Sequence, residues 1–163
     1  MTRIVRYLGI AVLLLGFVSL AVGSVFIFEG VRADSKVADN LRAEKVTLGI
    51  PEALVAKGDV VDSIKEAEKT AETLVEHRRA VALTYGDALG GGRFDPTNPS
   101  HLSYAQGMNL QTSMNLAVLA FGVSTVMIAS GAFMAIMGIA LGVTGVALLV
   151  LARRIPQSPS ARI

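Results

Sequence analysis

The chain has 163 residues, of which 52% are hydrophobic and only 17% are charged, and its mean hydropathy is +0.56. A typical soluble domain carries about 25% charged residues. Because the chain has no cysteine, a disulfide-stapled secreted domain, a thiol enzyme and cysteine-based zinc or iron–sulfur sites are excluded. The apolar residues stand in long blocks, which predicts a small integral membrane protein of mainly α structure.

The charged residues are unevenly distributed. All thirteen acidic residues lie between Glu29 and Asp95, together with ten basic residues, so this stretch has a net charge of −3. Both ends of the chain carry only basic residues, namely Arg3, Arg6, Arg153, Arg154 and Arg162. The overall charge of +2 therefore describes an acidic middle between basic ends. Nucleic-acid binding needs a clustered basic face with stacking aromatic residues, so we expect no nucleic-acid partner.

Residues 8–28 form an apolar run of 21 residues, which as a transmembrane helix would span about 31 Å, close to the ~30 Å hydrocarbon core of a bilayer. Basic residues precede this run and Glu29 follows it, so the positive-inside rule places residues 1–7 in the cytoplasm. A cleaved signal peptide is the alternative, because Ala21-Val22-Gly23 has the spacing of a cleavage site. We favour an uncleaved anchor, since the apolar run continues past this site to Phe28.

Residues 114–152 form a second apolar helical block, and the 37 residues from Leu116 to Ala152 include no charge. One helix of 37 residues would measure about 55 Å, more than a single crossing needs. Either one long helix enters the membrane near Ala129, with a second transmembrane helix over about 129–152, or two short spans turn back near Ser130-Gly131. The basic tail at 153–163 favours two crossings, because two cytoplasmic ends require an even number.

Small residues recur along both apolar segments. Five of them, from Ala117 to Gly145, are spaced seven apart, which is typical of one continuous helix face, and Gly138 and Gly142 form a GxxxG motif that lets membrane helices approach closely. These faces either pack on each other within one chain or bind a second copy or a larger membrane complex. The predicted helix-packing residues are Gly9, Gly16, Ser19, Gly23, Gly131, Ala135, Gly138, Gly142 and Gly145.

Residues 29–113 are expected to form a small α-rich extracytoplasmic domain. Apolar spacing over 32–44 predicts an extension of the first helix, and short extended pieces are expected at 46–48 and 58–61. Ser63-Ile64-Lys65-Glu66 is a capping box, which predicts a helix to about Leu83. The pattern breaks at Tyr85-Gly86 and at the glycines of 90–92, which indicate a flexible loop. Ser100 is expected to cap a final helix that begins near His101.

Candidate catalytic and metal-binding residues are few. The chain has two histidines, His77 and His101, and neither has a partner at the spacing of a metal-binding pair such as HExxH. There is no GxSxG nucleophile elbow, and the apolar blocks hold no ionisable residue of the kind that transporters and proton relays use. We therefore predict no enzyme, no metal site and no cofactor. Convergence of His101 with Asp95 and Tyr104 would instead indicate a membrane-bound enzyme.

The layout resembles a family of small uncharacterised actinobacterial integral membrane proteins. The shared pieces are an N-terminal anchor, the element Leu41-Arg42-Ala43-Glu44-Lys45-Val46-Thr47, a helix that ends near Thr84-Tyr85-Gly86, and a closing Gly/Ala-rich block. Some members carry the label of an aromatic ring-opening dioxygenase. Iron chemistry of that kind needs a His/carboxylate facial set, which two isolated histidines cannot supply. The resemblance implies a plasma-membrane location and this architecture, and no activity.

The predicted function follows from the small-residue faces and from the missing catalytic set. We expect a scaffold or accessory subunit that lies in the lipid bilayer and either self-associates or joins a larger membrane complex through those faces. The alternative is an envelope sensor or binding module that uses the extracytoplasmic domain. A well-formed pocket in that domain would favour this alternative.

Overall fold

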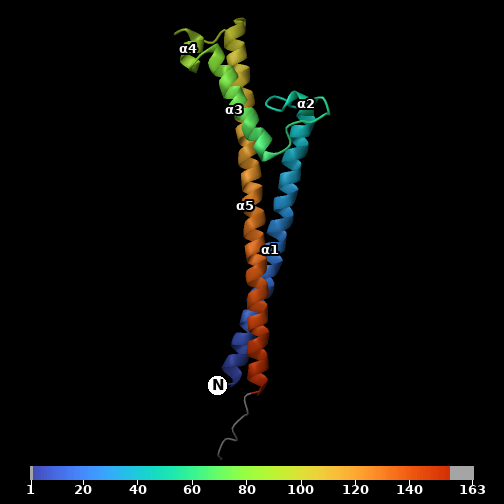
Figure 1. Ribbon diagram of the computed structural model, residues 1–163. Helices are drawn as coiled ribbons and strands as arrows, with labels where there is room; N and C mark the ends of the chain where they lie inside the picture. Colours follow the sequence, from blue (N-terminus) through green and yellow to red (C-terminus); the bar gives the residue numbers. More distant parts are fainter. Residues whose placement is uncertain (1, 155–163) are drawn as a thin grey trace, which may run out of the picture. The chain divides into compact units, whose positions relative to one another are not determined.

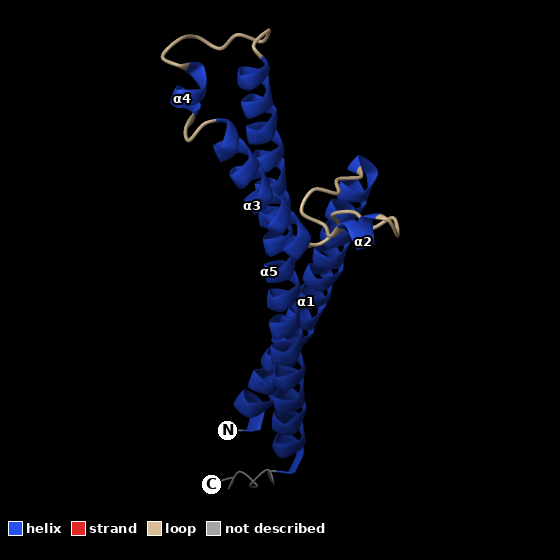
Figure 2. Ribbon diagram, turned by 45° about the horizontal axis from the view of Figure 1, so that its top comes forward, coloured by secondary structure: helices blue, strands red, loops and turns tan. Residues whose placement is uncertain are grey.

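The computed structural model describes residues 2–154, in which the chain is mainly helical and contains no strand (Figures 1 and 2). The prediction of a mainly α protein is confirmed. Most of the predicted cytoplasmic tail, residues 155–163, lies outside the described residues. The helices are α1 (Thr2–Glu44), α2 (Glu52–Val55), α3 (Ile64–Val81), α4 (Tyr85–Leu89) and α5 (Pro99–Arg154).

The chain divides into two compact units. Unit 1 combines the part of α1 up to Val31 with the part of α5 from Val126 onward. Unit 2 is the stretch Arg32–Thr125, which contains α2, α3 and α4 and the remaining parts of the two long helices. Apart from Glu29, every acidic residue therefore falls in unit 2.

Both long helices are apolar enough to cross a membrane, and they are the two helices of the described residues that meet this criterion. α5 runs without interruption through Ser130 and Gly131, so the turn between two short spans that the sequence left open is not formed. Residues 116–152 contain no proline, asparagine or aspartate that would stop a helix. The predicted extension of the first helix over residues 32–44 is confirmed, since α1 ends at Glu44.

The start of α5 differs from the prediction. The helix begins at Pro99, and Ser100 is not its cap. Instead, the Ser100 backbone N–H donates to Asn98 Oδ1 at 3.0 Å, and the Leu102 N–H donates to the Asn98 carbonyl at 3.0 Å. Asparagine is a preferred N-cap residue, and proline suits the first helical position because its missing N–H is not needed there.

The core of unit 2 is small and brings α1, α3 and α5 together. Its largest members are Leu41 from α1, Leu74 from α3, and Met114 and Phe121 from α5, each no more than 8% exposed. The remaining buried residues of this core are Ala38, Val61, Ala67, Ala71 and Ala117. The predominance of alanine lets α3 lie close against α5, as Figures 1 and 2 both show.

The predicted extended pieces at 46–48 and 58–61 are not strands. They meet through a backbone hydrogen bond from the Val61 N–H to the Val46 carbonyl at 2.8 Å. The chain turns at Gly49, which has a φ of +84°, a conformation that glycine adopts without steric cost. The Thr70 hydroxyl then donates to the Leu48 carbonyl at 2.6 Å and ties this turn to α3.

The capping box at the start of α3 is confirmed, and the helix ends at Val81, two residues before the predicted end. Sequence reasoning missed α4, which follows directly. Thr84 and Asp87 form a second capping box, and Gly90 ends the helix in the left-handed conformation at a φ of +59°. The predicted break in the helical pattern is present, since α3 has ended before Tyr85, but Tyr85 and Gly86 then open a helix of five residues that the sequence did not indicate.

Candidate functional site

Six glycines bring α1 and α5 into backbone contact within unit 1. We call them the glycine seam: Gly9, Gly16 and Gly23 on α1, and Gly131, Gly138 and Gly145 on α5. A Cβ added at Gly16 would lie 2.8 Å from the Gly138 carbonyl oxygen, and one added at Gly23 would lie 2.7 Å from the Gly131 carbonyl oxygen. A Cβ added at Gly145 would lie 2.8 Å from the Leu13 backbone nitrogen. At Gly16, Gly23 and Gly145 a larger residue would therefore force the two backbones apart, whereas at Gly9 the nearest atom, Leu149 Cγ, lies 3.1 Å from an added Cβ.

The register of the seam shows that the two helices are antiparallel. Gly9 lies against Gly145 and Leu149, whereas Gly23 lies against Gly131 and Ala135. The seven-residue spacing on each helix keeps the glycines on one face, as in a coiled coil. Small residues at such an interface allow the backbones to approach closely and gain van der Waals contact.

The other predicted packing residues take different parts in this interface. The Ser19 hydroxyl donates to the Met134 carbonyl at 2.8 Å and links the helices directly. Ala135 presents its backbone nitrogen 2.9 Å from the position of a Cβ at Gly23. Gly142 differs, because a Cβ added there would meet no atom within 4 Å. In the GxxxG motif, therefore, the absent side chain matters at Gly138 and not at Gly142.

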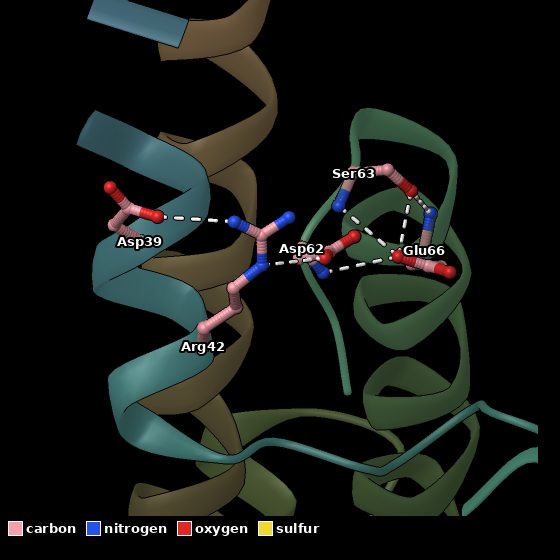
Figure 3. A network of polar contacts seen from close by, with 5 residues as sticks. All are labelled: Asp39, Arg42, Asp62, Ser63 and Glu66. Carbon is pink, nitrogen blue, oxygen red and sulfur yellow. Dashed lines mark hydrogen bonds and ion pairs between the residues drawn. The ribbon is translucent and has the colours of Figure 1, made fainter. Parts of the chain in front are cut away.

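A polar network closes unit 2 at the start of α3 (Figure 3). Arg42 of α1 donates from Nε to Asp62 at 2.8 Å and from Nη1 to Asp39 at 3.1 Å. The hydrogen bond and the charge of Asp62 raise the pKa of the Arg42 guanidinium above its ordinary value. Glu66 accepts from the Ser63 N–H and hydroxyl at 3.1 and 2.7 Å. These side chains are partly exposed, so their ion pairs add little stability.

Replacing Ser63 with alanine removes the cap of α3 and is expected to lower the free energy of unfolding of unit 2 by about 1 kcal/mol. Far-UV circular dichroism during thermal unfolding in a mild detergent measures this loss. Thr73→Ala is the matched control, because the Thr73 hydroxyl bonds only the Lys69 carbonyl of its own helix. An equal loss in both variants would contradict the role of the cap.

Of the three groups whose convergence would indicate an enzyme, His101 and Asp95 meet through the Asp95 backbone N–H, whereas the Tyr104 hydroxyl pairs with Arg78. His101 is 9% exposed, and its Nδ1 accepts from the Asp95 backbone N–H at 3.1 Å. Asp95 Oδ1 accepts from the Thr97 hydroxyl at 2.7 Å and from the Thr97 N–H at 2.8 Å. The Tyr104 hydroxyl accepts from Arg78. The bonds of Asp95 fix the loop that leads into α5, and the bond of Tyr104 joins α5 to α3.

The bonds from the Thr97 hydroxyl and backbone N–H lower the pKa of the Asp95 carboxyl. A carboxyl whose pKa is lower in the folded chain stabilises the fold while it is ionised. This stabilisation is present above the ordinary aspartate pKa of about 3.9 and is lost as the pH falls through the lowered value.

Thr97→Val removes the hydroxyl donor and is therefore expected to move the pKa of Asp95 up toward its ordinary value. An NMR titration of the Asp95 carboxyl carbon measures the change. Thr112→Val serves as the control, since the Thr112 hydroxyl donates to the Met108 carbonyl instead. An unchanged pKa in the Thr97 variant would show that the hydroxyl does not cause the shift.

The residues that the structure describes contain no group of three or more histidine, cysteine or acidic side chains that could hold a metal ion. His77 lies on the exposed part of α3, and His101 lies in the first turns of α5.

Unit 2 has shallow hollows of about 270, 370 and 480 Å³ along its helices. Arg78 is one of the residues that line the smallest of these hollows. Arg78 also contacts Tyr104, and the sequence did not reveal this contact because the two residues are 26 positions apart.

Comparisons with protein-family models, with curated proteins and with solved structures found no match to this chain.

Proposed function

We propose that the chain is an integral membrane protein that serves as a scaffold or accessory subunit of a membrane complex and has no catalytic centre of its own. In this proposal, unit 1 crosses the bilayer as two antiparallel helices and holds unit 2 outside it. The observation that carries the proposal is the glycine seam, which joins two apolar helices through their small residues and leaves the large ones outside.

The outer surface of unit 1 supports a lipid environment. Its large apolar side chains are widely exposed, among them Phe17 at 69%, Phe133 at 65% and Ile136 at 65%. A soluble monomer rarely exposes a contiguous apolar patch larger than a few hundred Å². In a bilayer the same side chains would contact lipid tails, and the helical backbone would satisfy its own hydrogen bonds.

The antiparallel seam also supports a topology. Arg3 and Arg6 precede the seam on α1, and Arg153 and Arg154 follow it on α5, so all four lie toward the same end of unit 1. The positive-inside rule assigns such an end to the cytoplasm. Unit 2 would then be extracytoplasmic, in the plasma membrane of a bacterial cell.

Single cysteines test this topology cleanly because the chain has none of its own. A membrane-impermeant maleimide applied to intact cells is expected to label Lys57→Cys in unit 2 and to leave Ser160→Cys in the tail unlabelled until the cells are opened. Labelling of the tail in intact cells would overturn the two-crossing topology.

Association with a second protein would use surfaces other than the seam. The seam glycines are in contact within the chain, so a partner would contact the outer apolar faces of α1 and α5 or the surface of unit 2. Purification from native membranes in a mild detergent, with mass measurement of the particle and identification of what accompanies it, tests the proposal. A stoichiometric partner is the expected result, whereas a bare monomer would refute the accessory role.

A further inference from the structure

The ring of His101 makes a hydrogen bond that requires the neutral form of histidine. Its Nδ1 accepts from the Asp95 backbone N–H at 3.1 Å. A ring nitrogen that accepts carries no proton, so the proton of the neutral ring is on Nε2. In the charged imidazolium both ring nitrogens are donors. Protonation of His101 would therefore set two N–H donors against each other and break the bond.

The same short segment of chain makes two contacts with this ring. The Phe94 ring lies 6.1 Å from the His101 ring, centre to centre, at an angle of 31°. Phe94 directly precedes Asp95, and His101 is only 9% exposed. The imidazole therefore attaches this segment, residues 93–95, to the first turn of α5.

The chain on the two sides of this segment differs in how firmly it is held. After it, the turn at 95–98 has bonds of its own, since the Asp95 carbonyl accepts from the Asn98 N–H at 3.1 Å. Before it, Gly90 and Gly91 have positive φ values, and a Cβ added at either would meet no atom within 4 Å. These glycines leave the segment free to move once the bond to the imidazole is lost, while the turn can stay formed.

The Asp95 carboxylate adds a charge beside the ring. Its electrostatic coupling to His101 favours the protonated imidazole. The bonds from Thr97 hold the pKa of this carboxyl below its ordinary value, so it stays ionised between about pH 5 and 8, the range in which histidine ordinarily changes charge. Arg93, the other charged residue of the segment, is exposed. Mild acid would therefore charge the ring and leave Asp95 ionised.

Other titratable groups come from α4 and from the end of α3, which lie near the start of α5 (Figure 1). They are His77, Arg78 and Arg79 on α3 and Tyr85 and Asp87 on α4. Arg78 donates to the Tyr104 hydroxyl, and Asp87 accepts from Thr84. No hydrogen bond or ion pair in the described part of the chain joins any of these groups to His101. The bond to Asp95 is thus the contact that a charge on His101 alters directly.

We propose that His101 is a pH-sensitive latch. Its neutral ring holds residues 93–95 against the first turn of α5, and protonation at Nδ1 releases them. The latch belongs entirely to unit 2, so it does not depend on the scaffold role. The proposed topology adds only that the latch would respond to the pH outside the cell.

The test follows ¹⁵N-labelled full-length protein by NMR, in neutral detergent micelles, from about pH 8 to pH 5. The exchange of the Asp95 amide with water is measured by magnetisation transfer and divided by the intrinsic rate at each pH. This ratio is expected to rise about tenfold toward pH 5, the change that corresponds to losing one hydrogen bond, and to follow the titration of the His101 ring signals. A ratio that stays constant while the ring titrates, or a ring that stays neutral throughout, would overturn the latch.

Three variants separate the bond from the charge. His101→Asn keeps an acceptor near the position of Nδ1 but does not titrate, so slow exchange of the Asp95 amide is expected at both pH values. His101→Phe keeps a ring without an acceptor, and fast exchange is expected at both. His77→Asn removes the exposed histidine of α3 and is expected to respond to pH as the parent does. A pH response that survives in His101→Asn, or one that disappears in His77→Asn, would contradict the proposal.

Discussion

Gly138→Ala is expected to destabilise the pairing of α1 and α5 by about 1–3 kcal/mol, whereas Gly142→Ala leaves it unchanged or slightly stronger. The two glycines belong to one GxxxG motif, but only one of them is confined. A Cβ at Gly138 would lie 2.7 Å from the Gly16 carbonyl oxygen and 2.7 Å from the Leu20 backbone nitrogen, while a Cβ at Gly142 would meet nothing. Backbone atoms cannot move aside as a flexible side chain can, so the helices must separate.

The measurement uses energy transfer between dyes on Arg3→Cys and Arg154→Cys as SDS is added to mixed micelles. A lower SDS midpoint for the Gly138 variant, with the Gly142 variant close to the parent, is the expected order. Equal midpoints for the two variants would show that the seam does not determine helix pairing.

Leu74→Ala is expected to cost unit 2 about 2–5 kcal/mol, the usual penalty for emptying a buried leucine site. Leu74 is 5% exposed and packs in the core that α1, α3 and α5 share. Leu83 offers the same substitution in a different setting, because it is 75% exposed. Leu83→Ala is therefore expected to change stability by less than about 0.5 kcal/mol.

Hydrogen–deuterium exchange of α3 amides, followed by mass spectrometry, measures this loss for unit 2 alone. A destabilisation of 2 kcal/mol corresponds to roughly 30-fold faster exchange through unfolding of the unit. Slow exchange retained in the Leu74 variant would mean that α3 does not depend on this core.

The parts of the fold that could be predicted are those with local signals. The apolar spacing over 32–44 predicts that α1 continues beyond Glu29, and the Ser63–Glu66 box predicts the start of α3 within one residue. In each case the residues that decide the structure lie within a stretch of 13 residues or fewer. The sequence also marked the faces of small residues, but it left open whether they meet within the chain.

The parts that could not be predicted depend on weaker or more distant signals. The run of glycines after Leu89 hid α4, although Thr84 and Asp87 have the spacing of a capping box. Asn98-Pro99 has the residues of a turn as well as those of a helix start. The contact of Arg78 with Tyr104 joins residues on different helices, and no local pattern encodes it.

The most direct test of the central claim is a disulfide between Gly9→Cys and Leu148→Cys in this cysteine-free chain. A Cβ at Gly9 would lie 3.2 Å from Leu148 Cβ, slightly closer than the ~3.5–4.5 Å of most disulfides. Mild oxidation is expected to consume both thiols while the protein remains a monomer on a non-reducing gel. The pair Gly9→Cys with Val146→Cys is the control, because Val146 is 51% exposed. Disulfide-linked dimers, or thiols as reactive as those of the control, would contradict an intrachain glycine seam.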